Sequence, residues 1–154
     1  MRSTVVAAAI AVAVLNAVPA LLGAWLWYWG EPTAVATRAF WVVLRVGQGA
    51  ALTLAIAVAS LAAAGRHPRE GLFYLYALLP LAVALIGEQL RAASAQAVLD
   101  RRDLPDAQAV GSLPEREQHA VVEQIVRREI GVMALACAVV VFLALRAAGT
   151  AHGF

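Results

Sequence analysis

The sequence contains few charged residues and no lysine. Only 14% of its 154 residues are charged, all twelve basic residues are arginine, and 62% are hydrophobic. A soluble globular domain is about a quarter charged and about half apolar, so this composition excludes an ordinary soluble domain and predicts a single-domain integral membrane protein. We attribute the missing lysine to a coding bias rather than to function, because a solvated surface can use either basic residue.

Residues that carry catalysis or bind metals are also scarce. The one cysteine, Cys137, cannot form an internal disulfide, a two-cysteine redox pair or a cysteine-rich metal site. His119 and Glu123 are one helical turn apart, but two ligands do not complete a zinc site. The sequence shows no glycine-rich phosphate loop, no Gly-x-Ser-x-Gly motif and no Ser-His-Asp spacing. It therefore predicts no catalytic residue, no metal and no cofactor.

Long apolar runs dominate the rest of the chain. A membrane-spanning helix needs about 20 apolar residues. Residues 1–20 have the layout of a secretory signal peptide, but the apolar run continues to Tyr28, which predicts a retained first span. We predict an all-α fold: a polytopic four-helix membrane bundle that forms one domain over residues 1–154. Its predicted spans cover residues 5–28, 40–64, 71–98 and 115–147.

The third and fourth predicted helices extend past their apolar runs. Residues 112–115 read Ser-Leu-Pro-Glu, a capping-box pattern that predicts a helix start near Ser112. Apolar residues then recur at helical spacing in both extensions. The stripes are Val122, Ile125 and Val126 in the fourth helix and Leu90, Ala93, Ala97 and Val98 in the third. They predict an antiparallel helical hairpin that projects from the bilayer with these faces packed together.

Polar side chains gather where the apolar runs end, and they form the candidate ligand site. Its residues are Arg45, Gln48, Glu88, Arg91, Arg128 and Glu129. Helical spacing predicts that Arg45, Glu88 and Glu129 each lie on an otherwise inward-looking face. The residues that share these faces are Arg38, Trp41 and Leu52 for Arg45, Leu81 and Leu85 for Glu88, and Val122, Ile125 and Met133 for Glu129. Ionisable residues at membrane depth usually face the interior and are functional candidates.

The sequence leaves two interpretations of this polar layer open. In the first, Arg45 pairs with Glu88 or Glu129, Glu88 also pairs with Arg91, and these pairs fix the helix register. In the second, the layer is a pocket for an ion or small molecule, and several arginines favour an anion. Asn16, alone in the first apolar run, is expected to have its amide hydrogen-bonded within the fold.

The function predicted from these features is that of a membrane protein. We expect a small multi-pass protein that binds or carries an ion, a lipid head group or a small anionic molecule. The alternative is an accessory or scaffold subunit of a larger membrane complex. A third hypothesis, an intramembrane enzyme, has no nucleophile–base pair to support it. The expected partners are the lipid bilayer and a second copy or a complex subunit, and not nucleic acid, since the arginines are not interleaved with aromatic residues. Arg2, ahead of the first span, favours a cell-membrane protein with both termini cytoplasmic. Counting the arginines at the helix ends gives the opposite orientation, with the long third connection in the cytoplasm.

Overall fold

The computed structural model describes residues 2–30, 32–68 and 71–151, and within these ranges it is all-helical, with no strand. Four of its helices are long and apolar enough to cross a membrane. The helices are α1 (Arg2–Tyr28), α2 (Ala34–Ala63), α3 (Leu72–Asp100), α4 (Ala107–Gly111) and α5 (Glu115–Thr150). Glu31, Arg69 and Glu70 lie outside the described residues.

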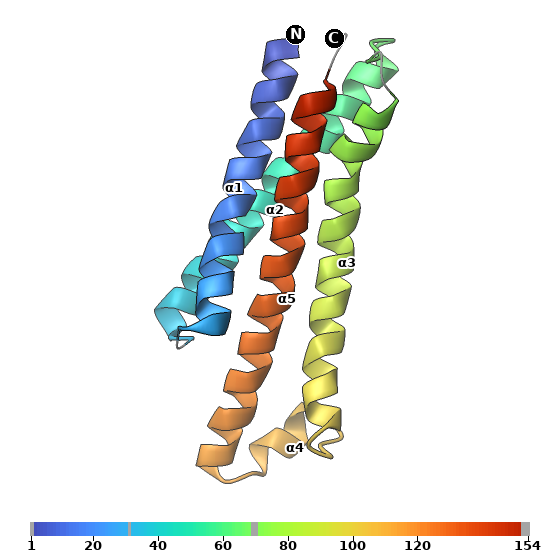
Figure 1. Cartoon of the computed structure of the whole chain (residues 1–154). Coiled ribbons are helices and arrows are strands. Elements are labelled where there is room, and N and C mark those ends of the chain that lie inside the picture. Colours follow the sequence, from blue (N-terminus) through green and yellow to red (C-terminus); the bar gives the residue numbers. More distant parts are fainter. Residues whose placement is uncertain (1, 31, 69–70, 152–154) are drawn as a thin grey trace.

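The four long helices lie side by side, with α5 between α1 and α3 and α2 behind them (Figure 1). The start of α1 and the end of α5 are at the same end of the molecule. At the opposite end, α3 and α5 continue well beyond the end of α1, and the short helix α4 joins them at the tip (Figure 1). The antiparallel extension predicted from the polar ends of the third and fourth helices is therefore present.

Local side-chain contacts set the helix ends. Thr33 accepts a hydrogen bond from the Ala36 amide at the start of α2, and Asp106 accepts one from the Ala109 amide at the start of α4. The predicted capping box at Ser112 is wrong. The Ser112 hydroxyl donates to the Ala109 carbonyl, 2.7 Å away, and so satisfies a carbonyl at the end of α4. Helix α5 begins at Glu115, directly after Pro114.

Two apolar clusters hold the long helices together. The cluster nearer the start of α1 includes Val12, Leu54, Phe73 and Val140, one from each long helix. The second cluster includes Leu26, Phe40, Ile130 and Met133, which come from α1, α2 and α5. Both clusters draw on α5, which is the central element of the packing.

Small residues let the backbones approach closely at several of these contacts. A Cβ atom placed on Gly23 would lie 2.6 Å from Phe40 Cε2 and 2.7 Å from Ala134 Cβ. The amide of Asn16, which is buried, donates to the Val12 carbonyl at 2.9 Å and to the Gly47 carbonyl at 3.2 Å. The prediction that this amide is satisfied within the fold is confirmed.

We expect Gly23→Ala to lower the melting temperature of the detergent-solubilised protein, because the added methyl group has no space between α1, α2 and α5. Gly49→Ala is the matched control, since a Cβ at Gly49 meets nothing within 4 Å and alanine favours a helix by about 1 kcal/mol over glycine. Differential scanning fluorimetry of both variants measures the difference. Equal melting temperatures would contradict the close packing at Gly23.

The inward face of the projecting hairpin differs from the prediction by one position on α5. Val121 is completely buried, whereas Val122 is 52% exposed. On α3, Val98 is completely buried, whereas Leu90 is exposed. Adjacent helical residues point about 100° apart, so the predicted stripe through Val122 was rotated away from the real contact. The packing of α3 on α5 in the hairpin therefore depends on Val121 and Val98.

Candidate functional site

Glu88 is the centre of the polar layer and contacts side chains from two helices. Its Oε1 atom accepts from Arg45 Nη1 at 2.6 Å and from Gln48 Nε2 at 3.1 Å, both on α2. Its Oε2 atom lies 3.1 Å from Arg91 Nε, one turn further along α3. Arg45 Nη1 also donates to Gln48 Oε1 at 2.6 Å. Each oxygen of this partly buried carboxylate therefore faces at least one cationic group.

Arg91 extends the layer to α5 and to the aromatic surface of α2. Its Nη1 atom lies 3.8 Å from Glu129 Oε2, and its guanidinium carbon lies 5.0 Å from the ring centre of Trp41. An arginine above an indole face gains a cation–π attraction in addition to its ion pairs. The layer thus connects α2, α3 and α5 through alternating charges: Arg45, Glu88, Arg91 and Glu129.

The structure brings together five of the six residues predicted for the site. The predicted pairs of Glu88 with Arg45 and with Arg91 are confirmed, and Glu129 pairs with Arg91 rather than with Arg45. Arg128 does not join the layer, since it makes no hydrogen bond or ion pair with any described residue. Two apolar neighbours predicted to face inward, Leu52 and Leu85, are exposed instead.

A groove of about 1230 Å³ lies beside the layer, between the first half of α2 and the projecting part of α5. Most of its wall is apolar. The residues from α2 and the turn before it are Pro32, Thr33, Ala34, Thr37, Arg38, Trp41, Val42, Arg45 and Val46. Those from α5 are His119, Val122, Glu123 and Val126. Arg45 belongs to both the layer and the groove, so the two features share a boundary.

The charges on the groove wall do not balance. Arg38 makes no hydrogen bond or ion pair with any described residue, whereas Arg45 is paired with Glu88. Among the described residues of the wall, Glu123 is the only acidic one, and it is 3.2 Å from Arg127 on the same helix, as its i,i+4 spacing predicts. The groove therefore presents an unneutralised positive charge at Arg38.

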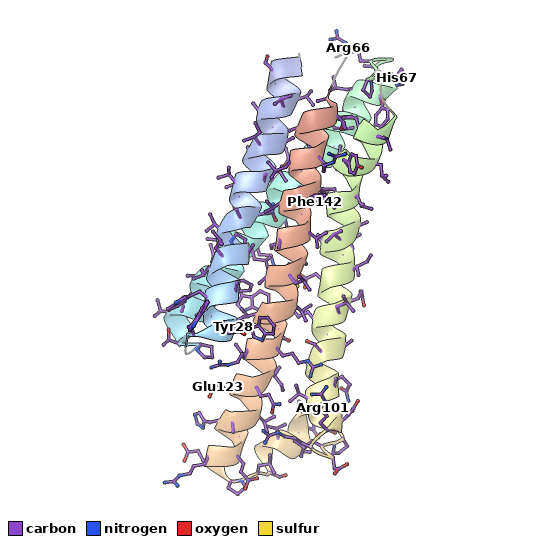
Figure 2. All side chains as sticks on the ribbon, in the orientation of Figure 1. Tyr28, Arg66, His67, Arg101, Glu123 and Phe142 are labelled. Atoms are coloured by element: carbon purple, nitrogen blue, oxygen red, sulfur yellow. The ribbon has the colours of Figure 1, made fainter. Side chains whose placement is uncertain are left out.

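Arg127 also fixes α5 relative to the end of α1. Its Nη1 atom donates to the Trp27 carbonyl at 3.4 Å, and its Nη2 atom donates to the Gly30 carbonyl at 3.3 Å. The terminal carbonyls of a helix lack partners within the helix, so these bonds satisfy groups at the end of α1. Figure 2 shows Glu123 on α5 beyond the end of α1, and Tyr28 near that end.

Sequence reasoning identified the layer but not the groove. Arg38 and Trp41 were recognised only as members of the same helical stripe as Arg45, and their spacing was the available signal. Their shared cavity depends on the position of α2 relative to α5. The chain matches no protein-family model, and neither curated proteins nor solved structures give a significant match. The geometry of the layer and groove is therefore the basis for a functional proposal.

Proposed function

We propose that the chain is a multi-pass cell-membrane protein in which α1, α2, α3 and α5 form a four-span bundle with both termini cytoplasmic. The length and apolar character of these helices support this placement. Large apolar side chains are also exposed along them, including Leu21, Leu85, Leu135 and Phe142. Contiguous apolar surface of this kind is rare on soluble monomers and suits contact with lipid.

The end of α1 supports a membrane boundary at the level of the groove. Trp25, Trp27, Tyr28 and Trp29 are all more than half exposed there, and such aromatic residues favour the membrane–water interface. Arg127 binds the end of α1, so this level corresponds to residue 127 of α5. The earlier part of α5 and the last turns of α3 then project into water. The Arg/Glu layer lies near the boundary, where its charges pair across the helices.

We propose that the protein binds a small anionic molecule or an anionic head group in the groove between α2 and α5. One observation carries this proposal: Arg38 is unpaired on the wall of a large, mostly apolar groove. The layer itself is mutually neutralised by four charges and serves as a clamp between α2, α3 and α5. Within this clamp, Arg45 remains 55% exposed, so it can contact a ligand without losing Glu88.

Stabilisation by a simple amphiphile tests this proposal. We expect dodecyl phosphate to raise the melting temperature of the protein in a neutral detergent, because a ligand that binds the folded state stabilises it by mass action. Dodecanol at the same concentration is the control for its apolar chain. Thermal unfolding with each compound measures the difference. Equal effects of the two compounds would contradict an anion-binding groove.

The projecting hairpin supports a second proposal, in which the chain is an accessory subunit of a membrane complex. The observation in its favour is that α3, α4 and α5 extend beyond the end of α1 and offer a surface away from the spans (Figure 1). This role predicts a stable complex with another protein, detected by its mass in mild detergent. The complex should dissociate when residues 101–114 are replaced by a short glycine-serine linker. A single-component mass under the same conditions would favour the ligand-binding role.

A further inference from the structure

We infer that the groove between α2 and α5 holds an anionic phospholipid from the surrounding bilayer, with its phosphate at Arg38 and Arg45 and an acyl chain along Val42 and Val46. This inference rests on the proposed function and specifies the ligand. It follows from the order of charged and apolar residues along α2, from the position of the groove at the membrane boundary and from its size.

The phosphate position follows from the charges. Arg38 and Arg45 lie seven residues apart on α2, about 10 Å along the helix axis, and both line the groove with Trp41 between them. Arginine presents a planar set of donors that suits phosphate oxygens, and a charge-assisted bond of this kind is stronger than a neutral one. Arg38 has no described partner to lose on binding. Thr37 is on the same wall, and its buried hydroxyl makes no hydrogen bond.

The acyl-chain position follows from the direction of α2. Helix α2 begins at the level of the end of α1 and runs towards the other end of the molecule (Figure 1). Arg38 is in the second turn of α2, near this start. Val42 and Val46 follow on the groove wall and are each more than half exposed. From the boundary inwards the wall therefore runs Arg38, Val42, Arg45 and Val46, so it begins with a cation and ends with apolar surface, as a bilayer lipid does from head group to tail.

The size of the groove favours a lipid over a small soluble anion. Pockets for drug-sized ligands usually occupy about 300–1,000 Å³, and this groove is larger at about 1230 Å³. A soluble phosphate would contact the arginines and leave the valine surface bare. A phospholipid covers both parts of the wall. It can enter the groove by lateral diffusion, because bilayer lipids lie at the same level as the groove.

Lipid retention measured by native mass spectrometry tests the inference. The protein is delipidated in neutral detergent and mixed separately with phosphatidylglycerol, phosphatidylcholine and glycerol phosphate. We expect phosphatidylglycerol to be retained in preference to both others, and Arg38→Gln to weaken its retention about tenfold, as the loss of one charge-assisted contact does. Val42→Trp, which fills the groove without changing charge, should also weaken it.

Arg101→Gln is the matched control, since Arg101 is exposed at the far end of α3, outside the groove (Figure 2). Equal losses in Arg38→Gln and Arg101→Gln would overturn the inference, because retention would then follow overall charge. Equal retention of phosphatidylcholine would overturn the requirement for an anionic head group, and equal retention of glycerol phosphate would indicate a soluble ligand. If dodecyl phosphate stabilises the protein while phosphatidylglycerol is not retained, the proposed anion site stands and the lipid assignment fails.

Discussion

Val121→Asp should open the projecting part of α3, α4 and α5 to protease while the rest of the four long helices stays folded. Val121 is completely buried where α5 packs against α3, so the new carboxylate would lie away from water. Burying a carboxylate without a partner costs several kcal/mol, more than this short hairpin can absorb. Limited proteolysis of the detergent-solubilised protein should cut between Asp100 and Glu115 at a far lower protease concentration than in the unsubstituted protein.

Val122→Asp is the control for this experiment, because it makes the same chemical change one residue away at an exposed position. We expect its protease resistance to match that of the unsubstituted protein. If Val122→Asp opened the hairpin and Val121→Asp did not, the inward face of α5 would be the one predicted from the sequence stripe, and the described packing would be wrong.

Glu88→Ala should cause the largest loss of stability among single changes in the polar layer. The carboxylate contacts Arg45, Gln48 and Arg91, and its removal leaves the partly buried Arg91 with the 3.8 Å contact to Glu129 as its one ion pair among the described residues. Breaking a fully buried ion pair costs about 3–5 kcal/mol, and the partial exposure of this one reduces the expected loss to about 2 kcal/mol. That loss corresponds to a melting temperature about 4–8 °C lower for a chain of this size.

A double-mutant cycle separates this loss from general effects of substitution. Arg45→Ala alone should cost less than Glu88→Ala, because Arg45 is more exposed and is only one of the partners of Glu88. In the Glu88→Ala background, Arg45→Ala should cost almost nothing further, since the interaction is already absent. Gln89→Ala, an exposed neighbour on α3, is the control. Additive losses in the cycle would contradict a direct Arg45–Glu88 interaction.

The number and approximate extent of the long helices could be predicted because a spanning helix needs an unbroken apolar run of known length. Contacts within one helix were also predictable, since residues three or four apart are neighbours on a helix surface. The Glu88–Arg91 and Glu123–Arg127 pairs are of this kind, and both are present. The prediction of a capping box is wrong because the hydroxyl of Ser112 bonds instead to the end of the short helix α4.

The inward faces of the long helices could not be predicted in the same way. In a soluble helix the buried face is apolar and the exposed face is polar, but on a membrane helix both faces are apolar because lipid tails are as apolar as leucine. Leu85 is exposed and Met133 is buried, although sequence spacing placed both on inward faces. Arg45 pairs with Glu88 and not with Glu129 because of how α2, α3 and α5 are placed relative to one another. The groove depends on the same placement, which spacing within one helix does not determine.

The most direct test of the four-span topology is the accessibility of two cysteines to a membrane-impermeant thiol reagent. In a Cys137→Ala background, which removes the native buried thiol, Ala64→Cys and Gln108→Cys each place one thiol at an exposed site at opposite ends of the long helices. In intact cells we expect Gln108→Cys to react and Ala64→Cys to react only after the membrane is permeabilised. Reaction of both cysteines from the same side of the membrane would contradict the four-span arrangement.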